Sequence, residues 1–347
     1  MKPLVSILIP AYNSERWIAD AIRSALAQTW SHKEVVIVDD GSTDQTLSVA
    51  RGFASKNVCV ETQPNQGASA ARNTAFTKSQ GDYITWLDAD DMLAPDKLEV
   101  QVKALDRCQS ERTLLSGAWG TFFYRCEKAR FNPSPLWQDL SPAEWLRRKI
   151  GQDCHMQTAT WLVSRKLTEA AGPWDVRLWK DNDGEYICRV ILACDGVRFI
   201  PEAKVYYRET DYNRVSFVGR SNKKLESQFL SMQLHIGYLR SLDDSAASHA
   251  ACLKYLQKYM FDYHPDRPDI VERMQQIAAN LGGRLEYPRS SWKYAWIEKL
   301  FGWNAAKRAQ IFFPTIRQAA WRWWDKAMYS MQRDGKATSC PTSNETA

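Results

Sequence analysis

The chain has 347 residues, of which 25% are charged and 44% hydrophobic, so it can form one large globular domain with an additional segment. Its net charge of +6 is concentrated near the C-terminus, because residues 284–336 contain eleven Lys or Arg and only four Asp or Glu. No apolar run approaches the ~18 residues that cross a bilayer, and the N-terminus has no apolar signal core, so we expect a cytoplasmic protein. The eight cysteines show no Cys-x-x-Cys spacing, so we expect neither a disulfide framework nor a zinc site.

Short apolar runs alternate with amphipathic segments in the first hundred residues. The runs 4–9, 34–38, 58–61 and 82–87 predict strands, and the apolar spacing from Ile18 to Leu26 predicts a helix. Ser42 followed by Gln45 has the pattern of a capping box, and a small-residue helix is expected from Gly67 to Phe76. Such alternation predicts an α/β fold with a doubly wound, mainly parallel sheet, whose strand-end loops meet at one edge, where ligands bind.

Strand and helix patterns are mixed in the middle of the chain and purely helical after it. Strands are expected at 114–124, 158–164, 197–200 and 204–207, with helices beginning at Ser141 and spanning 184–194. We therefore divide the chain into three parts: a first domain over 1–220, with a first part over about 1–110 and a second over about 111–220; a helical region over 221–335; and a disordered tail over 336–347.

Three carboxylates crowd the end of the fourth predicted strand, in the tract Asp88-Ala89-Asp90-Asp91. A divalent cation would relieve their mutual repulsion, and oxygen ligands at Asp88 and Asp90 suit Mg²⁺ or Mn²⁺ shared with phosphate oxygens. The alternative is a solvated acidic turn in which Asp91 caps the next helix.

Three further tracts carry polar groups at the same predicted edge. An Asp in 39–44 can accept a hydrogen bond from a base or a ribose, although this tract also reads as a turn. The small residues of 65–73 allow close approach to a ligand, and Arg72 can pair with a phosphate, or can be a surface side chain. The segment 174–185 offers acids and tryptophans that suit a sugar, or simply the polar start of a helix.

In their order along the chain, these tracts closely resemble glycosyltransferase family 2, whose nucleotide-binding fold is called GT-A. The resemblance is strong over residues 3–100, weaker over 155–215, and does not extend past about 220. The matching tracts are Val5–Asn13, Val35–Asp44, Asn65–Gly67 with Ala71–Asn73, and Gly81–Asp91.

The resemblance implies a role for individual residues. A nucleotide would contact Pro10, Ala11, Tyr12, Asp39, Gly67, Arg72 and Asp88, and the metal would be held by Asp90 and Asp88. Asp183 takes the place of the family's catalytic base, with Asn182 where the family has Glu, and Asp181 remains a rival for that role. Trp174, Asp181 and Glu185 are expected on the side of the donor sugar and acceptor.

The implied activity is that of an inverting hexosyltransferase-type enzyme, of class EC 2.4. It would move a sugar from a nucleotide sugar, most simply a UDP-sugar, to a glycan or lipid-linked acceptor in surface polysaccharide or cell-envelope glycan synthesis. Two departures matter: Glu209-Thr210-Asp211 supplies no His as a further metal ligand, and no Gln-x-x-Arg-Trp motif of processive synthases is present. A non-catalytic family member that binds a nucleotide or glycan is the alternative, whereas a dehydrogenase is disfavoured because no Gly-x-Gly-x-x-Gly follows the first strand.

Aromatic and basic residues interleave at helical spacing over 289–333. This pattern is typical of helices that lie on an anionic membrane, here the inner face of the plasma membrane, and equally of helices that pack on the domain or on a second subunit. The sequence does not decide between these two, nor does it determine the oligomeric state. Nucleic-acid binding is disfavoured, because the first domain offers no basic groove.

Overall fold

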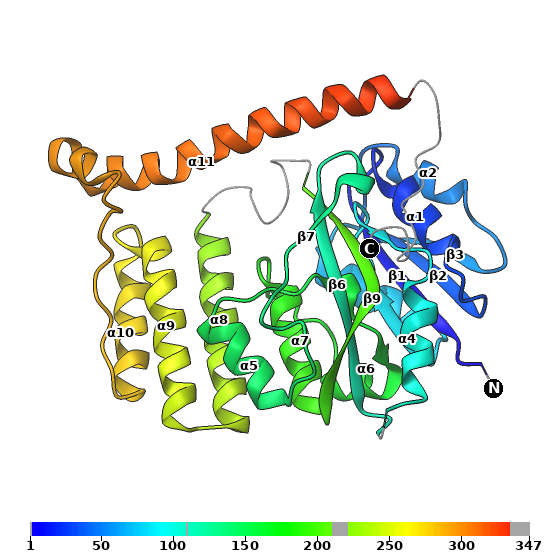
Figure 1. Cartoon of the computed structure of the whole chain (residues 1–347), viewed down its shortest axis with the longest axis horizontal. Helices are drawn as coiled ribbons and strands as arrows, with labels where there is room; N and C mark the ends of the chain where they lie inside the picture. Colours follow the sequence, from blue (N-terminus) through cyan, green and yellow to red (C-terminus); the bar gives the residue numbers. More distant parts are fainter. Residues whose placement is uncertain (1, 109, 210–220, 334–347) are drawn as a thin grey trace.

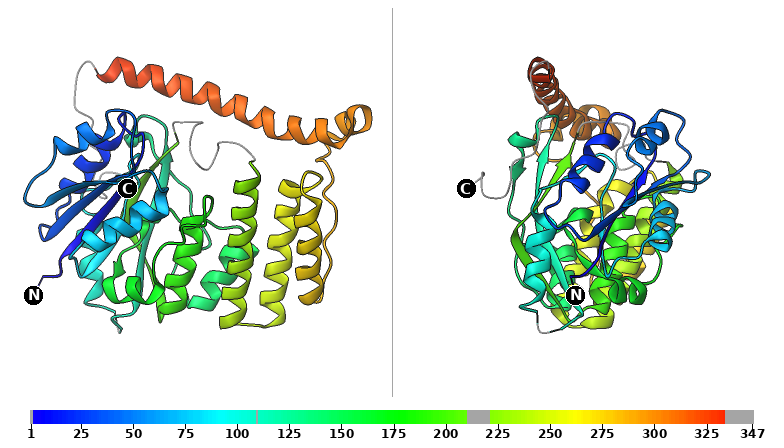
Figure 2. Two further views of the ribbon diagram at one scale, coloured as in Figure 1. Left: turned by 180° about the vertical axis from the view of Figure 1, so that it is seen from behind. Right: turned by 90° about the vertical axis from the view of Figure 1, so that its right-hand side faces the viewer.

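The computed structural model describes residues 2–108, 110–209 and 221–333, and the predicted tail at 336–347 lies outside them. Two sheets form one half of the molecule and a group of upright helices forms the other (Figure 1). A long helix lies across one edge of both halves. The two views of Figure 2 agree that this helix lies outside the layers of the sheets.

The first sheet has the strand order β3-β2-β1-β4-β8. β1 pairs in parallel with β2 and β4, β2 pairs in parallel with β3, and only β8 is antiparallel. All seven residues of β1 are buried, as expected for a parallel strand covered on both faces. The four strands predicted in the first hundred residues are confirmed. These four are β1 (Val5–Ala11), β2 (Lys33–Asp39), β3 (Val58–Thr62) and β4 (Tyr83–Trp86), and the fifth strand of the sheet is β8 (Val163–Ser164).

The helices between these strands follow the prediction except at one start signal. The helices are α1 (Ile18–Leu26), α2 (Thr46–Arg51), α3 (Ala68–Lys78) and α4 (Lys97–Leu105). The capping box expected at Ser42 is wrong, because α2 begins only at Thr46, whose amide donates to Asp44. Ser42 instead accepts a hydrogen bond from the amide of Asn13 (3.0 Å), which joins the loops after β1 and β2.

A second sheet, of order β5-β9-β6-β7, packs beside the first. β6 and β9 pair in parallel, with a register shift between Gly117 and Ala118, and the two strands predicted at 197–200 and 204–207 are one continuous strand. The strand predicted over 158–164 is wrong in its first half, where the 3₁₀ turn η2 (Thr158–Thr160) precedes β8. The members are β5 (Met92–Leu93), β6 (Thr113–Phe122), β7 (Arg130–Phe131) and β9 (Gly196–Arg208), with the short turn η1 (Cys126–Lys128) after β6.

The helical half shares a core with the sheets. One cluster of buried side chains runs from Trp86 in β4 through Tyr186 to Met232, Tyr255 and Met274. The cluster contains residues from both sides of position 220, so the packing gives no boundary there. The predicted division at 220 stays a prediction. The helices are α5 (Pro142–Gly151), α6 (Arg165–Ala171), α7 (Asn182–Ala193), α8 (Asn222–Leu242), α9 (Ala246–Tyr263) and α10 (Pro268–Asn280).

The helix α11 (Ala295–Arg333) contains a kink at Gly302, whose φ of 80° is not helical. After the kink, Lys307 donates to Asp266 (2.9 Å), and near the other end Asp325 accepts from the Arg125 side chain (2.7 Å). These two contacts hold the helix across the molecule, over the sheets and over α8 to α10 (Figure 1). Within the described residues, no helix is both long and apolar enough to cross a membrane.

Lys97, in α4, is fully buried and donates to the Thr85 hydroxyl (3.1 Å) and the Trp161 carbonyl (3.2 Å). Burial lowers its pKa well below the ordinary lysine range. At pH values between the folded and unfolded pKa, the unfolded chain binds a proton that the folded chain does not. The free energy of unfolding should therefore rise with pH up to about 10.4, the ordinary lysine pKa. Chemical unfolding across pH should show a smaller rise in Lys97→Met.

Lys103→Met is the matched control, because Lys103 lies in the same helix with a side chain that is 68% exposed. It should keep the pH slope of the wild type. Equal slopes in Lys97→Met and the wild type would show that Lys97 keeps its proton in the folded state.

Candidate active site

The strand order places the candidate nucleotide residues at one edge of the first sheet. The direction of crossover reverses between β1 and β4, and ligands bind beyond the carboxyl ends of strands at such a point. Pro10 and Ala11 are buried at the end of β1, with Ala11 in register with Asp39 at the end of β2. Tyr12 follows with 47% of its surface exposed, and Asp88 follows β4. These residues are therefore gathered at the edge that the sequence predicted.

The two aspartates at the end of β2 have different contacts. Asp39 is buried, and its Oδ2 accepts from the Ser42 amide (3.3 Å) and the Thr62 hydroxyl (3.2 Å). Its Oδ1 is also buried and has no hydrogen-bond partner among the described residues. An unsatisfied buried acceptor is costly, so this atom suits an N–H or O–H donor of a ligand. Asp40 instead accepts from the Gly67 amide (2.8 Å) and shapes the loop before α3.

Arg72 extends from α3 toward the acidic tract and is 5% exposed. Its Nη2 donates to Asp88 Oδ1 (2.7 Å), and its guanidinium lies 4.3 Å from the ring centre of Trp174. Its Nε and Nη1 are buried without a hydrogen-bond partner among the described residues. Two spare donors on a fixed guanidinium are suited to phosphate oxygens.

The three carboxylates of the acidic tract are separated by their surroundings. Asp91 is fully buried and accepts from the Gln157 side chain (2.6 Å) and the Arg208 amide (2.9 Å). The expectation that Asp91 caps a helix is wrong, since β5 follows it directly and α4 begins only after Asp96. Asp88 is 30% exposed and Asp90 is half-buried. Asp88 and Asp90 are thus the carboxylates of the tract that are not fully buried.

Arg208, at the end of β9, is a residue whose importance the sequence did not indicate. It is 2% exposed, its Nε donates to the Asp90 carbonyl (2.8 Å), and its Nη2 donates to Asp20 (3.0 Å). The guanidinium also lies 4.1 Å from the ring centre of Trp17. Burial lowers its pKa, while the nearby Asp20 carboxylate acts in the opposite direction. Arg208 therefore fixes the backbone of the acidic tract to α1.

Asp181 stands at the start of α7 with a left-handed φ of 57°. Its Oδ2 accepts from the Ser231 hydroxyl (2.8 Å) and lies 3.8 Å from His235 Nδ1. Burial lowers the pKa of His235 to about 4, so this ring is neutral near pH 7. A Cβ at Gly184 would lie 2.1 Å from Asp181 Oδ1, so a larger residue there would displace the Asp181 carboxylate. These contacts suit Asp181 to holding the helix start.

Two links bring Asp183 to the acidic tract. Its Oδ2 lies 3.5 Å from the Thr158 hydroxyl, and the preceding residue, Gln157, is the partner of Asp91. Asn182 donates to Ser69 (3.1 Å) in the first turn of α3, the helix that carries Arg72. The half-buried Asp183 carboxylate is thereby held on the side of the sheet edge where Asp88 and Asp90 lie.

Trp174 and Glu185 are both buried and in contact with other side chains, and their expected place beside the donor sugar and acceptor stays a prediction. Trp174 is 2% exposed and stacks on Tyr186 with ring centres 4.0 Å apart. Glu185 is 1% exposed, pairs with Arg189 (2.7 Å) and accepts from the Tyr238 hydroxyl (2.6 Å). Aromatic and acidic side chains occur in protein cores as well as in sugar-binding sites. The sequence alone does not distinguish these two settings.

The donor set of the acidic tract fits a divalent cation only in part. Asp88 and Asp90 supply two carboxylates, and the described part of the chain contains no group of three or more His, Cys, Asp or Glu arranged to hold a metal ion. Mg²⁺ usually takes one or two carboxylates and fills its other positions with phosphate oxygens and water. Two carboxylates beside the spare donors of Arg72 fit that pattern. The question of a third ligand after β9 concerns residues 209–211, of which 210 and 211 lie outside the described residues.

Comparisons with known proteins agree with this geometry. Residues 6–165 match the model of the family described as Glycosyl transferase family 2. An uncharacterized glycosyltransferase of Haemophilus influenzae is 45% identical over 103 residues, which are 29% of this chain and 41% of that protein. The putative teichuronic acid biosynthesis glycosyltransferase TuaG of Bacillus subtilis is 40% identical over 105 residues, 29% of this chain and 42% of that protein. The chondroitin synthase of Escherichia coli is 46% identical over 100 residues, 28% of this chain and 15% of that protein. Residues 6–165 are therefore a glycosyltransferase family 2 domain, and the chain spans less than half the length of these relatives.

Solved structures agree on the fold. Residues 1–349 of TarS from S. aureus, in complex with UDP-GlcNAc, match with a TM-score of 0.64 and 19% identity over 79% of this chain and 81% of that chain. The same protein in complex with UDP matches with a TM-score of 0.60 and 17% identity over 88% of this chain and 90% of that chain. The expected GT-A fold with a helical C-terminal region is confirmed.

Asp91→Asn should lower the stability of the fold, because it changes a fully buried side chain. The buried amide cannot accept from both the Gln157 side chain and the Arg208 amide as the carboxylate does. An unsatisfied buried polar group costs about 1–3 kcal/mol, which chemical unfolding would measure. Asp106→Asn is the control, since Asp106 is exposed at the end of α4. Equal stability of the two variants would contradict the structural role of Asp91.

Proposed function

We propose that the chain is an inverting glycosyltransferase that moves a sugar from a UDP-sugar to a hydroxyl of a glycan or lipid-linked acceptor. The observation that carries this proposal is the grouping of Asp183 with Asp88, Asp90 and the spare donors of Arg72 at one sheet edge. The shared fold with a UDP-GlcNAc complex of TarS supports a UDP-sugar donor. The likeness to TuaG and chondroitin synthase supports a role in surface polysaccharide or cell-envelope glycan synthesis.

Donor binding would use the unsatisfied groups of the site. The free oxygen of Asp39 accepts from the base, beside Pro10, Ala11 and Tyr12, and Gly67 allows close approach because a Cβ there would meet nothing within 4 Å. Arg72 donates its spare N–H groups to the diphosphate. Each contact satisfies a protein group that is costly to leave unpaired, which contributes to affinity.

The reaction is a single displacement with inversion at the anomeric carbon. The acceptor oxygen forms a bond to that carbon while the bond to the diphosphate oxygen breaks, and the nucleoside diphosphate leaves. Asp183 takes the proton of the attacking hydroxyl. Arg72 stabilises the negative charge that develops on the diphosphate.

A divalent cation, Mg²⁺ or Mn²⁺, would be held by Asp88 and Asp90, and when bound it would supply charge stabilisation to the diphosphate. Arg208 keeps the backbone of Asp90 in place for that role. Asp91 is fully buried and committed to Gln157 and Arg208, so it is not a ligand in this proposal.

We assign the base to Asp183 rather than to its rival Asp181. Asp181 already accepts from Ser231 and lies against Gly184, where it shapes the start of α7. Although burial opposes its ionisation, the charge of Lys149 and the bond from Ser231 contribute to a lowered pKa, so Asp181 is a weak base. Asp183 is half-buried, and among the described residues its carboxylate has only the long contact to the Thr158 hydroxyl.

Asp183→Asn should reduce transfer about 10²- to 10⁴-fold, the usual contribution of a general base, while UDP binding is retained. Asp90→Asn should instead weaken the dependence of turnover on added Mg²⁺ or Mn²⁺. The measurement is UDP release from a panel of UDP-sugars with a cell-envelope extract as acceptor.

Asp106→Asn serves as the control, since it removes one exposed carboxylate far along α4. Full turnover in Asp183→Asn would sink the assignment of the base. Tight binding of UDP without release from any donor would support the alternative of a non-catalytic binding protein.

We also propose that α11 and the segment before it dock on an anionic membrane. The side of α11 that faces the protein is marked by Lys307 and Asp325. Trp323 is two positions from Asp325 and so lies on the opposite side of the helix, and Phe312, three turns earlier, shares that side. They are 71% and 61% exposed.

Further apolar surface and positive charge surround these residues. Trp292, Trp296, Leu300 and Phe301 are all more than half exposed before the kink. The exposed basic residues nearby are Arg289, Lys293, Lys299, Arg308 and Lys326. Exposed aromatic side chains with flanking cations are typical of interfacial helices, and each cation near an anionic surface adds about 1 kcal/mol.

The double variant Phe312→Ala/Trp323→Ala should bind vesicles of phosphatidylglycerol and phosphatidylcholine at least about tenfold more weakly, because each lost side chain removes roughly 1.5–3 kcal/mol of burial. Co-sedimentation measures this, and binding should fall with salt and on phosphatidylcholine alone. Leu242→Ala is the control, since Leu242 is 40% exposed at the end of α8. Unchanged vesicle binding in the double variant, or a stable dimer that binds no vesicles, would overturn the proposal.

A further inference from the structure

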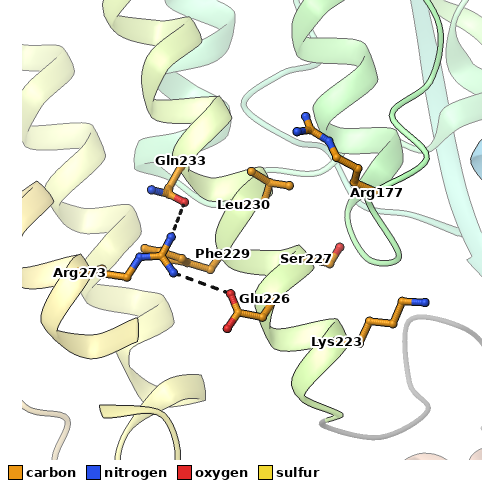
Figure 3. Close-up of a pocket in the computed structure, with 8 residues that line it drawn as sticks. All are labelled: Arg177, Lys223, Glu226, Ser227, Phe229, Leu230, Gln233 and Arg273. Carbon is orange, nitrogen blue, oxygen red and sulfur yellow. Dashed lines mark hydrogen bonds and ion pairs between the residues drawn. The ribbon is translucent and has the colours of Figure 1, made fainter. Parts of the chain in front are cut away.

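A pocket of about 390 Å³ lies between α8, α10 and the segment before α7, away from the sheet edge. Figure 3 shows Arg273 on one side of α8 and Arg177 on the other, while Lys223 extends from the start of α8 itself. Its lining also includes Glu226 and Ser227 from α8. Three cations and one carboxylate therefore face the same hollow.

The negative charge near the pocket is already committed to other partners. Glu226 is hydrogen-bonded to Arg267 and lies 3.8 Å from Arg273, so one carboxylate serves two guanidinium groups. Arg177 is paired with Asp175 (2.7 Å). Arg273 is about half exposed, and an exposed ion pair at that separation contributes little to stability, so it can be exchanged for a ligand.

Lys223 carries the clearest excess of positive charge. Its Nζ lies 3.5 Å from the ring centre of Trp179, and no ion pair joins it to a carboxylate among the described residues. Lys180 and Lys224 lie close by. Burial lowers the pKa of Lys224, and the positive charge of Lys180 lowers it further. Crowded like charges of this kind are relieved by an anion.

The pocket is joined to the proposed catalytic base. The Ser227 hydroxyl in its wall accepts from the amides of Trp179 (2.8 Å) and Lys180 (3.0 Å). One turn further along α8, Ser231 donates to Asp181. Lys180 is three residues before Asp183, a span of at most ~10 Å.

We infer that this pocket binds a phosphate or carboxylate group of the acceptor, with Lys223 and Arg273 as its cationic contacts. The inference rests on the proposed function, because it places the anion on the acceptor side of Asp183. Arg72, which is proposed to bind the donor diphosphate, lies against Trp174, and Ser69 of the same helix accepts a hydrogen bond from Asn182. An acceptor held at both its hydroxyl and its anionic group would be oriented for attack.

The test is a titration of the full chain with inorganic phosphate and, separately, with acetate. Binding is followed through the indole N–H signal of Trp179 in NMR spectra, assigned with Trp179→Phe. We expect a saturable shift whose dissociation constant rises about tenfold or more in Lys223→Gln, since a charge-assisted contact is lost. Arg273→Lys keeps the charge and should change the constant only a few fold.

Lys254→Gln is the control, because Lys254 is an exposed lysine of α9 that does not line the pocket. Saturation by phosphate or by acetate tells which anion the pocket prefers. The inference falls if the wild type shows no saturable shift, or if Lys223→Gln binds as the wild type does; thermal unfolding of each variant confirms that the fold is intact.

Hydrolysis of UDP-sugars without acceptor separates this inference from the proposed function. Lys223→Gln should leave that hydrolysis unchanged, since Lys223 is not part of the donor site. Absence of both hydrolysis and transfer from every UDP-sugar in the wild type, with anion binding intact, would remove the proposed function and leave an anion site. Normal hydrolysis with anion binding insensitive to Lys223 would remove the inference alone.

Discussion

The repulsion among Asp88, Asp90 and Asp91 is the constraint on which the site depends. Three carboxylates in four residues can coexist only if their surroundings differ. Asp91 is buried and accepts two hydrogen bonds, Asp88 pairs with Arg72, and the backbone of Asp90 is fixed by Arg208. The result is a tract whose position is set by buried contacts while two of its carboxylates stay accessible.

The same contacts connect distant parts of the chain. Arg208 reaches α1 through Asp20 and packs on Trp17, which in turn packs on Tyr124. Tyr124 contacts Tyr329 of α11, so the helix proposed to lie on a membrane is linked by packing to the acidic tract. On the other side, α8 holds the segment that leads to Asp183 and also lines the proposed anion pocket. Donor, acceptor and membrane sides thus share one framework.

Prediction from the sequence succeeded best where a residue follows a buried strand. The ends of parallel strands meet at one edge, so Asp39 and Asp88 could be placed together without coordinates. It was least decisive where residue type alone was the guide. Trp174 and Glu185 have the chemistry of a sugar site, yet one stacks on Tyr186 and the other pairs with Arg189. The sequence did not indicate the role of Arg208, because a single Arg at a strand end joins segments only through contacts with residues distant in the chain.

The sequence by itself determined the α/β pattern, four of the five strands of the first sheet and the order of the polar tracts, because these follow from local periodicity and from the polarity of strand ends. Only the tertiary structure decided which acids are buried, where the cations of α8 and α10 meet, and which side of α11 faces solvent. Burial and long-range pairing depend on the packing of segments far apart in the chain. The continuity of the core between the helical half and the sheets was beyond local patterns for the same reason.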